Sequence, residues 1–235
     1  MTKPLGQKAY GSIPHLPGSR LGPGDHHCHP GQQVIATTKP RDKHDRVIVT
    51  EKLDGSNVCI AKVEGQILAI NRAGYLCQSA PHEQHQIFAH WVRENESRFD
   101  NLLADGERAC GEWLAQAHGT IYQLPHEPFV VFDIMAGMRR TPWAEAERRC
   151  AELGVVTAGV ISDGPAFSIE DALAAVAESR HGALDPVEGA VWRVERKGEF
   201  DFMAKFVRHD KVDGKYFPQL TGGDIIWNWT PRKAA

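Results

Sequence analysis

Three short runs of strand-forming residues follow one another closely in residues 47–72, and they most constrain how this chain can fold. The runs are VIVTEK, NVCIAKV and QILAINR, and each is rich in β-branched residues. Glu64-Gly65 separates the second run from the third and is a good two-residue hairpin turn. Four later runs also predict strands, over residues 107–114, 128–134, 187–194 and 200–207.

Three segments between these runs predict helices, over residues 81–95, 141–154 and 168–179. The second helix has Thr141 as its N-cap, Pro142 at its first position and Gly154 after its end. Ser168 caps the third helix. The strands cluster in hairpins with helices inserted between the clusters, so the sequence predicts an α+β fold with antiparallel sheets.

The first 46 residues differ in composition from the rest of the 235-residue chain. Residues 1–46 are rich in Gly, Pro and His, and we expect an irregular N-terminal arm there. Ile13, Leu16 and Leu21 give this arm apolar side chains to bury, which favours an arm packed on the domain over a linker. Residues 47–235 then form the domain itself.

Charge and cysteine content limit the class of protein. A formal net charge of −3 argues against binding nucleic acid by bulk positive charge, so any polynucleotide contact needs a local basic groove. The five cysteines are odd in number and scattered without a CxxC pair, which favours reduced thiols in a cytosol. No apolar run approaches ~20 residues, so we expect a cytoplasmic protein with no membrane partner.

The segment VTEKLDGSNVCIAK places Lys52 between two strand-forming runs, immediately before Asp54-Gly55. This pair predicts a tight reversal, and Asp54 either stabilises that turn or acts directly in catalysis. A lysine amine attacks phosphorus only when it is neutral, whereas its reference pKa is about 10.4. Working near pH 7 therefore requires a shift of about 3 units, or roughly 4 kcal/mol. Partial burial beside a metal ion or another cation supplies such a shift.

Nucleotidyl transfer to Lys52 makes demands on the rest of the chain. The departing pyrophosphate needs cations, both a metal ion and basic side chains. The chain should therefore also contain a carboxylate for the metal, an aromatic ring for the base and a second lysine near the phosphate.

These features occur in order, and with them the sequence resembles the RNA ligase branch of the covalent nucleotidyltransferase superfamily. That superfamily also contains ATP-dependent DNA ligases and mRNA capping enzymes. The resemblance runs from about Tyr10 to about Val207 and implies a ligase adenylation domain. Six motifs carry it: KLDGSN (52–57), INRAG (70–74), CGEWL (110–114), VVFDI (130–134), VEGAVWR (187–193) and MAKFVR (203–208).

The resemblance implies how ATP is bound. Lys52 becomes linked to AMP, and Glu112 holds the ribose. Phe132 stacks on adenine, and Lys205 contacts the α-phosphate. The backbone around Glu51 helps to hold the adenosine.

The resemblance also implies a metal ion and a nucleic-acid end. Glu188 is the carboxylate that serves the metal-dependent steps, with Mg²⁺ or Mn²⁺ bridging the phosphates. Arg72 helps to bind the nucleic-acid end, and Arg208 belongs to the basic stretch 193–215 that lines the strand path. Asn57 takes a place in the nucleotide site rather than capping a hairpin.

The last motif departs from the family pattern. The family usually has two lysines there, as K-x-K, but Met203 and Val207 flank Lys205 at that spacing. Either Arg208 or Lys211 replaces the missing lysine, or the phosphate contact is weaker.

We therefore expect an ATP-dependent RNA ligase that joins 3′-hydroxyl and 5′-phosphate ends through lysyl-AMP and an adenylated 5′ end, with a role in RNA repair. The related DNA ligases and capping enzymes carry an OB-type module after the last motif, whereas 28 residues follow Val207 here. Two alternatives stay open. One is a DNA nick-sealing ligase of the same chemistry, and the other is a nucleic-acid end-binding protein that has lost catalysis.

Two histidine-rich stretches allow a metal site but favour simpler interpretations. DHHCH (25–29) has no CxxC partner and no second ligand pair at finger spacing, so we place it in the arm and keep structural zinc as an alternative. HEQH (82–85) lacks the HExxH pattern, and we expect an exposed or partly buried helix face.

Overall fold

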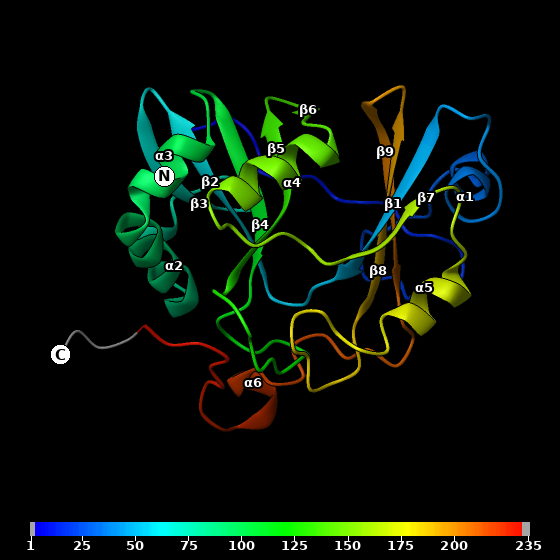
Figure 1. Ribbon diagram of the computed structural model, residues 1–235. Coiled ribbons are helices and arrows are strands. Elements are labelled where there is room, and N and C mark those ends of the chain that lie inside the picture. The colour runs from blue at the N-terminus through cyan, green and yellow to red at the C-terminus, as the bar shows by residue number, and fades with distance from the viewer. Residues whose placement is uncertain (1–2, 232–235) are drawn as a thin grey trace.

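The computed structural model describes residues 3–231, within which the strands form two antiparallel sheets (Figure 1). The first sheet has the strand order β7-β1-β8-β9. It contains β1 (Asp45–Lys52), β7 (Val160–Gly164), β8 (Gly189–Arg196) and β9 (Glu199–Val207). The second sheet has the order β3-β2-β4-β5-β6. It contains β2 (Ser56–Val63), β3 (Gln66–Asn71), β4 (Glu107–Trp113), β5 (Phe129–Ala136) and β6 (Arg139–Arg140). The predicted α+β class with antiparallel sheets is confirmed.

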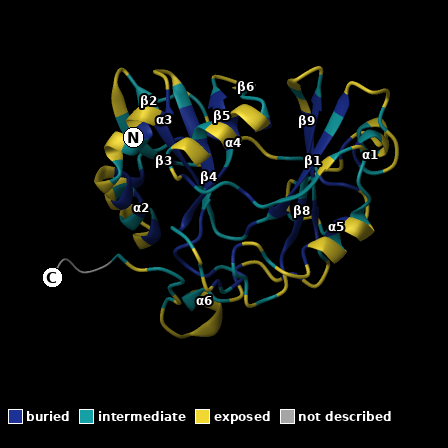
Figure 2. Cartoon of the chain, viewed as in Figure 1, coloured by how far each residue is buried: buried dark blue, intermediate teal, exposed yellow. Residues whose placement is uncertain are grey.

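Helices pack on one face of each sheet (Figures 1 and 2). The first sheet carries α1 (Pro30–Thr37) and α5 (Ile169–Ala175), and the second carries α2 (Glu83–Glu94), α3 (Glu96–Leu102) and α4 (Trp143–Glu152). The short η1 (Cys77–Ser79) precedes α2, and α6 (Pro218–Thr221) lies below the two sheets in Figure 1. Among the described residues, no helix combines the length and the apolar character needed to cross a membrane.

Buried aromatic rings form the core between the second sheet and its helices. Phe88 and Trp91 from α2 meet Trp113 from β4, with ring centroids 5.1 and 5.6 Å from that of Trp113. Phe99 and Phe129 complete the group. Because each such ring buries roughly 150–250 Å², this cluster fixes α2 firmly against the sheet.

The chain crosses from one sheet to the other between β1 and β2. β1 pairs with β7 and β8, whereas β2 pairs with β3 and β4, so Leu53, Asp54 and Gly55 connect the two sheets. The predicted tight reversal at Asp54-Gly55 is therefore wrong. Gly55 is required for another reason: a Cβ there would lie 2.5 Å from the backbone oxygen of Trp113.

The predictions of turns and helix ends are confirmed at some positions and wrong at others. The Glu64-Gly65 turn is confirmed, with φ values of 52° and 75° at its two residues. α4 begins later than predicted, with Pro142 as N-cap, and Glu195 accepts the N–H of Trp143 at 2.7 Å. The predicted cap by Thr141 is wrong. α5 ends at Ala175, four residues before its predicted end, and β7, α1 and α3 were not predicted.

The N-terminal segment is not irregular throughout, because it contains α1, which His29 caps. Leu16 is fully buried and lies beside β9, where its N–H donates to the carbonyl of Lys205 at 2.8 Å. Leu21, which we expected to be buried, is 42% exposed. On the other side, the N–H of Ala9 donates to the carbonyl of Arg72 at 3.0 Å, so this segment connects the two sheets.

Candidate active site

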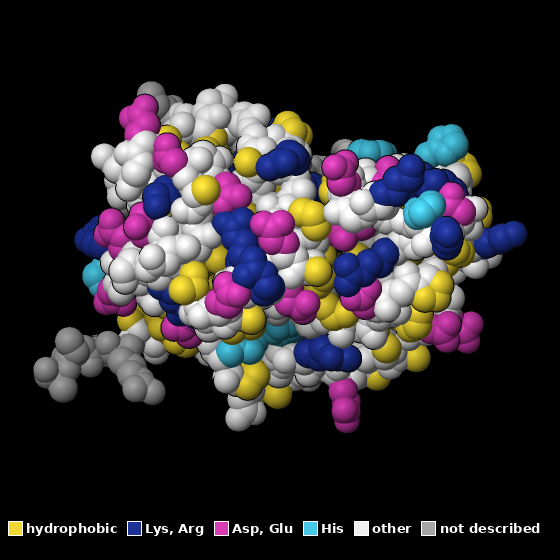
Figure 3. Space-filling model, turned by 45° about the horizontal axis from the view of Figure 1, so that its top comes forward, with side chains coloured by type: hydrophobic (Ala, Val, Ile, Leu, Met, Phe, Trp, Pro, Cys, Tyr) yellow, Lys and Arg dark blue, Asp and Glu magenta, His cyan; other side chains and the backbone are white. Residues whose placement is uncertain are grey.

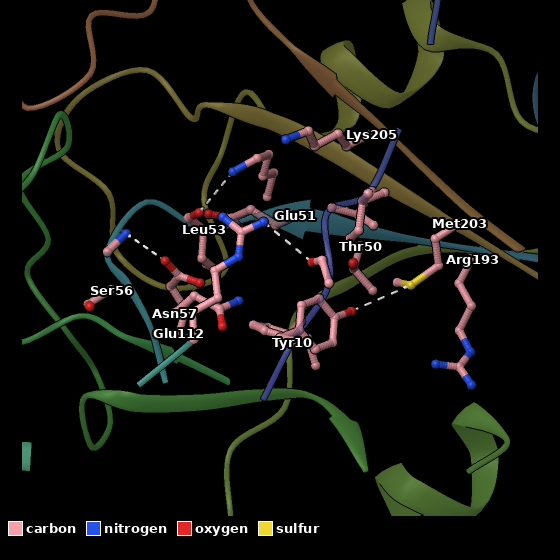
Figure 4. A pocket seen from close by; sticks show the side chains of 18 of the residues that line it. Tyr10, Thr50, Glu51, Leu53, Ser56, Asn57, Glu112, Arg193, Met203 and Lys205 are labelled. Carbon is pink, nitrogen blue, oxygen red and sulfur yellow. Dashed lines mark hydrogen bonds between the residues drawn. The ribbon is translucent and has the colours of Figure 1, made fainter. Parts of the chain in front are cut away.

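A cavity of about 540 Å³ lies between the two sheets. β1, β8 and β9 line one side, β2, β4 and β5 line the other, and Tyr10, Gly11 and Ile13 close the cavity from the N-terminal segment (Figure 4). Of the ten predicted site residues, seven line it: Glu51, Lys52, Asn57, Arg72, Glu112, Phe132 and Lys205.

Lys52 lies at the end of β1, where the chain leaves the first sheet. Its Nζ donates a hydrogen bond of 2.7 Å to Oε2 of Glu188. Burial alone would lower the pKa of Lys52, but the carboxylates of Glu188 and Glu112 outweigh burial and raise it. The lowered pKa that we expected from a neighbouring cation is therefore not produced by the protein alone, and Lys52 is an ammonium in this state.

Glu112 and Glu188 approach Lys52 from different sheets. Glu112, on β4, accepts the N–H of Gly55 at 3.1 Å, so the crossing segment holds it in place. Burial raises the pKa of Glu112 to about 8, against the opposing charge of Lys52. Glu188 precedes β8, and burial likewise raises its pKa. The two acidic groups are thus desolvated and held close to the amine of Lys52.

Asp54 points away from the cavity and binds the loop after β4. Its Oδ2 lies 2.6 Å from Nζ of Lys211 and accepts the N–H of Gly119 at 2.8 Å. The N–H of Asp54 donates to the hydroxyl of Tyr122 at 3.0 Å. The turn that Asp54 was predicted to stabilise is absent, and these bonds instead fix the segment that follows Lys52.

Lys205 lines the cavity from β9, and burial followed by the charge of Lys52 lowers its pKa. Its nearest acid is Asp25 of the N-terminal segment, with Nζ 3.8 Å from Oδ1. Asp25 also lies 3.1 Å from Nε2 of His15, and the backbone of Pro14 accepts the N–H of Lys205 at 3.0 Å. The N-terminal segment therefore contacts both the side chain and the backbone of Lys205.

Neither candidate for the missing second lysine reaches the cavity. Arg208 pairs with Asp210 at 2.5 Å beside a separate hollow of about 140 Å³. Lys211 lies on the wall of the same hollow and is bound to Asp54. Lys205 is thus left without a substitute partner from this part of the chain.

One end of the cavity is apolar and fits a planar base. The half-buried Phe132 meets the ring of Tyr10 edge-on, with centroids 5.0 Å apart. Other apolar side chains complete this end: Ile48, Trp143, Val191 and Met203. Phe132 thus presents a half-buried aromatic ring to the cavity.

Glu51 and Asn57 differ in how well their polar atoms are satisfied. The carboxylate of Glu51 accepts the hydroxyl of Ser179 at 2.6 Å and the N–H of Arg180 at 2.8 Å. The backbone N–H of Glu51 donates to the carbonyl of Gly159 at 3.0 Å, so the polar groups of this residue are largely satisfied within the protein. The side-chain oxygen of Asn57 is buried, and no described residue donates to it. A buried acceptor without a donor is costly, which points to a ligand there.

Arg72 lies at the mouth of the cavity, and its side chain is exposed. Its guanidinium donates to the hydroxyl of Ser12 at 3.0 Å and to the carbonyl of Gly11 at 3.4 Å. The remaining donors of this fork are free to contact a ligand.

Sequence reasoning missed several residues of the cavity wall. Arg193, which we placed only at the start of the basic stretch along the strand path, lines the cavity and pairs with Asp133 at 3.1 Å. A charge inside the apolar run AVWRV could have revealed this position. His82, His85 and His118 also line the cavity. As expected for the HEQH stretch, His82 is exposed and His85 is partly buried at the start of α2, and both side chains also form part of the cavity wall.

The residues of DHHCH have separate roles. Asp25 contacts His15 and Lys205, His29 caps α1, and Cys28 is buried in the core. Across residues 3–231, no three His, Cys, Asp or Glu side chains are grouped so that they could hold a metal ion. The geometry therefore gives no support to structural zinc.

Solved structures share this fold. The RNA ligase of Naegleria gruberi matches with a TM-score of 0.52 and 18% identity in a ligand-free form, covering 86% of this chain and 57% of that one. A form with ATP and Mn matches with a TM-score of 0.50 and 17% identity, covering 71% and 51% of the two chains. An archaeal ATP-dependent RNA ligase matches with a TM-score of 0.50 and 20% identity, covering 84% and 48%. The chain thus spans about half the length of these relatives, and it has the fold of a nucleotidyltransferase.

The family follows from the sequence comparison. A family model described as RNA ligase matches residues 45–207, and the chain belongs to this RNA ligase family. A short stretch of 33 residues is also 46% identical to an uncharacterized protein of Methanocaldococcus jannaschii, covering 14% of this chain and 8% of that one.

Proposed function

We propose that this protein is an ATP-dependent RNA ligase that works through a covalent lysyl-AMP intermediate on Lys52. One observation carries the proposal. Lys52 faces a cavity that also presents Glu112, Phe132 and Lys205, and its amine contacts Glu188. An amine, a base-stacking ring, a phosphate-binding cation and two acids are the parts that adenylyl transfer requires.

In the first step, Nζ of Lys52 forms a bond to the α-phosphorus of ATP. The bond from that phosphorus to the bridging oxygen breaks, and the electron pair leaves with pyrophosphate. The ammonium must lose a proton before it attacks, and Glu188 at 2.7 Å is the acceptor nearest to it. Lys205 stabilises the charge that develops on the phosphate oxygens.

The site fits a metal ion that is shared with ATP. Mg²⁺ typically binds one or two carboxylates and completes its shell with phosphate oxygens and water. Glu188 offers such a carboxylate, and the part of the chain that the structure describes contains no closed set of three protein ligands. A bound Mg²⁺ or Mn²⁺ would neutralise phosphate charge and offset the carboxylate that keeps Lys52 protonated.

The later steps use the two ends of an RNA. A 5′-phosphate oxygen attacks the phosphorus of lysyl-AMP, which breaks the P–N bond and releases Lys52. A 3′-hydroxyl then loses its proton and attacks the 5′-phosphorus, forming the phosphodiester and releasing AMP. Arg72, exposed at the mouth of the cavity, binds the 5′ end in this scheme.

The surface fits an enzyme that holds RNA locally. Lys and Arg alternate with Asp and Glu over the face in Figure 3, in keeping with the net charge of −3. We further propose RNA repair in the cytoplasm, supported by five cysteines that are all free and buried. Cys59 and Cys110 lie opposite each other on β2 and β4 as thiols.

The test is the intact mass of the purified protein after incubation with ATP and Mg²⁺, beside the Lys52→Ala variant. We expect a gain of one AMP that is absent in the variant, followed by sealing of an RNA nick in preference to a matched DNA nick. A protein that gains no AMP, after any preloaded AMP has been excluded, would be an end-binding protein instead. Equal sealing of both nicks would leave the chemistry intact but overturn the RNA preference.

A further inference from the structure

The cavity has a polar end, where Asn57 of the predicted nucleotide site lies among polar side chains that the predicted site does not include. In Figure 4, Ser56 and Asn57 lie on the opposite side from Met203 and Arg193. Three histidines line the cavity with them: His82, His85 and His118. His82 and His85 come from the start of α2, and His118 comes from the loop after β4.

The three imidazoles are held by neutral groups. Nε2 of His85 lies 2.8 Å from Oγ of Ser56, and Nε2 of His118 lies 3.2 Å from Oε1 of Gln84. The rings of His82 and His85 meet edge-on with centroids 5.7 Å apart. In the described chain none of the three pairs with a carboxylate, and Lys211 already neutralises Asp54, the acid that faces His118.

Counting hydrogens shows that the Ser56–His85 pair has a spare donor. The neutral pair carries one O–H and one N–H, and only one of these fits between Oγ and Nε2. Nδ1 of His85 is buried and has no partner among the described residues. Placing the hydrogen on Nδ1 would bury a donor without an acceptor, which is costly. The hydrogen therefore belongs on Nε2, which leaves the hydroxyl of Ser56 to donate into the cavity.

Other donors point to the same kind of ligand. His82 is the N-cap of the 12-residue α2 but makes no side-chain cap bond, so the first N–H groups of that helix are not satisfied by it. Arg72, which lines the same end, supplies positive charge. A ligand that meets a hydroxyl, imidazoles and a guanidinium must be rich in acceptors and anionic, as a phosphate is.

We propose that Ser56, His82, His85 and His118 form a subsite for a phosphate group of the RNA end, separate from the residues that hold AMP. The inference rests on the proposed function. RNA is favoured over the pyrophosphate part of ATP because His82 and Arg72 are exposed, so this end of the cavity opens to solvent and a polymer can continue outward.

The test separates adenylylation from sealing. The first assay follows the AMP adduct on Lys52 by intact mass with ATP and Mg²⁺. The second follows sealing of a nicked duplex whose 5′ end already carries AMP, so that the lysine chemistry is bypassed. The variants are the double variant His82→Ala/His85→Ala and the single variant His118→Ala. His90→Ala is the matched control, because His90 lies on the same helix with a 58% exposed side chain.

We expect the double variant to seal adenylated RNA at least 10-fold more slowly at subsaturating RNA, with adenylylation within twofold of wild type. His118→Ala should be slower by a smaller factor, and His90→Ala should be unchanged. The single variant His85→Gln should seal at a rate close to that of wild type, because its amide can still donate to Ser56.

Three results would overturn the subsite. If the double variant His82→Ala/His85→Ala and the single variant His118→Ala both seal at the wild-type rate, the imidazoles contact no RNA. A loss of adenylylation equal to the loss of sealing would assign the subsite to the phosphates of ATP or to folding. If the wild-type protein forms no AMP adduct at all, the proposed function is wrong, whatever the variants show.

Discussion

The close approach of Gly55 to Trp113 couples the fold to the position of Lys52. A Cβ on Gly55 would lie 2.5 Å from the Trp113 carbonyl oxygen and 3.0 Å from Cδ2 of Leu114. The first of these atoms belongs to the backbone of β4 and cannot rotate away. Gly55→Ala must therefore push the crossing segment, and with it Lys52, away from β4.

The size of the effect follows from two opposing contributions. Overpacking of this kind costs about 1–3 kcal/mol. Alanine also restricts the unfolded chain, which returns about 0.4–1 kcal/mol. The middle of each range leaves a net loss of roughly 1.3 kcal/mol, which corresponds to a fall in Tm of about 3–5 °C for a chain of this size. A displacement of Lys52 by about 1 Å also slows adenylylation by about 100-fold.

The assay pairs thermal unfolding with the rate of AMP adduct formation. Gly164→Ala is the matched control, since a Cβ there meets nothing within 4 Å. We expect its rate of adduct formation to stay at the wild-type value and its Tm to stay the same or rise slightly, because alanine restricts the unfolded chain. If Gly55→Ala melts with the wild type and forms the adduct at the same rate, the approach is not rigid. The link between the crossing segment and the reactive amine would then be refuted.

Two further predictions concern the acids around Lys52. Glu188→Gln removes the main cause that raises the pKa of Lys52, so amine labelling of Lys52 in the nucleotide-free protein should reach its midpoint at lower pH than in the wild type. An unmoved midpoint would show that Glu188 does not hold the proton there. For Glu112, burial raises the pKa from 4.5 to about 8, so between these values the folded protein holds a proton that the unfolded chain has released. Stability from this group is therefore present below pH 4.5 and lost as pH rises to 8. The Tm of Glu112→Gln should rise relative to wild type from pH 5 to pH 8, and a constant difference would contradict the assignment.

The sequence predicted those parts of the fold that short-range signals decide. The Glu64-Gly65 hairpin is such a case, because two adjacent residues determine the turn. The connection from β1 to β2 is not, because Asp54-Gly55 has the composition of a turn wherever it occurs. Its path depends on the pairing of β1 with β8, far along the chain. Because β8 lies outside residues 49–62, no pattern within these residues predicts the path of the connection.

The same distinction separates the predicted site residues from the missed ones. Lys52, Glu112 and Lys205 stand in motifs whose order along the chain indicated a shared site, and all three line one cavity. His82 and His85 were recognised only as one face of a helix. Helical spacing tells which residues share a face, but not what lies against that face, since packing of α2 on the second sheet decides it.

The protonation state of Lys52 in the nucleotide-free protein explains why its amine does not react while the cavity is open. Glu188 is the main cause that keeps it protonated, so it is a poor nucleophile until the charge of that carboxylate is offset. ATP alone would add negative charge and hold the proton more firmly, whereas ATP with a divalent cation brings a charge that opposes it. Attack is therefore expected only when nucleotide and cation are both present. In the proposed mechanism Glu188 would also be the residue that holds this cation, whose charge would offset the carboxylate that keeps Lys52 protonated.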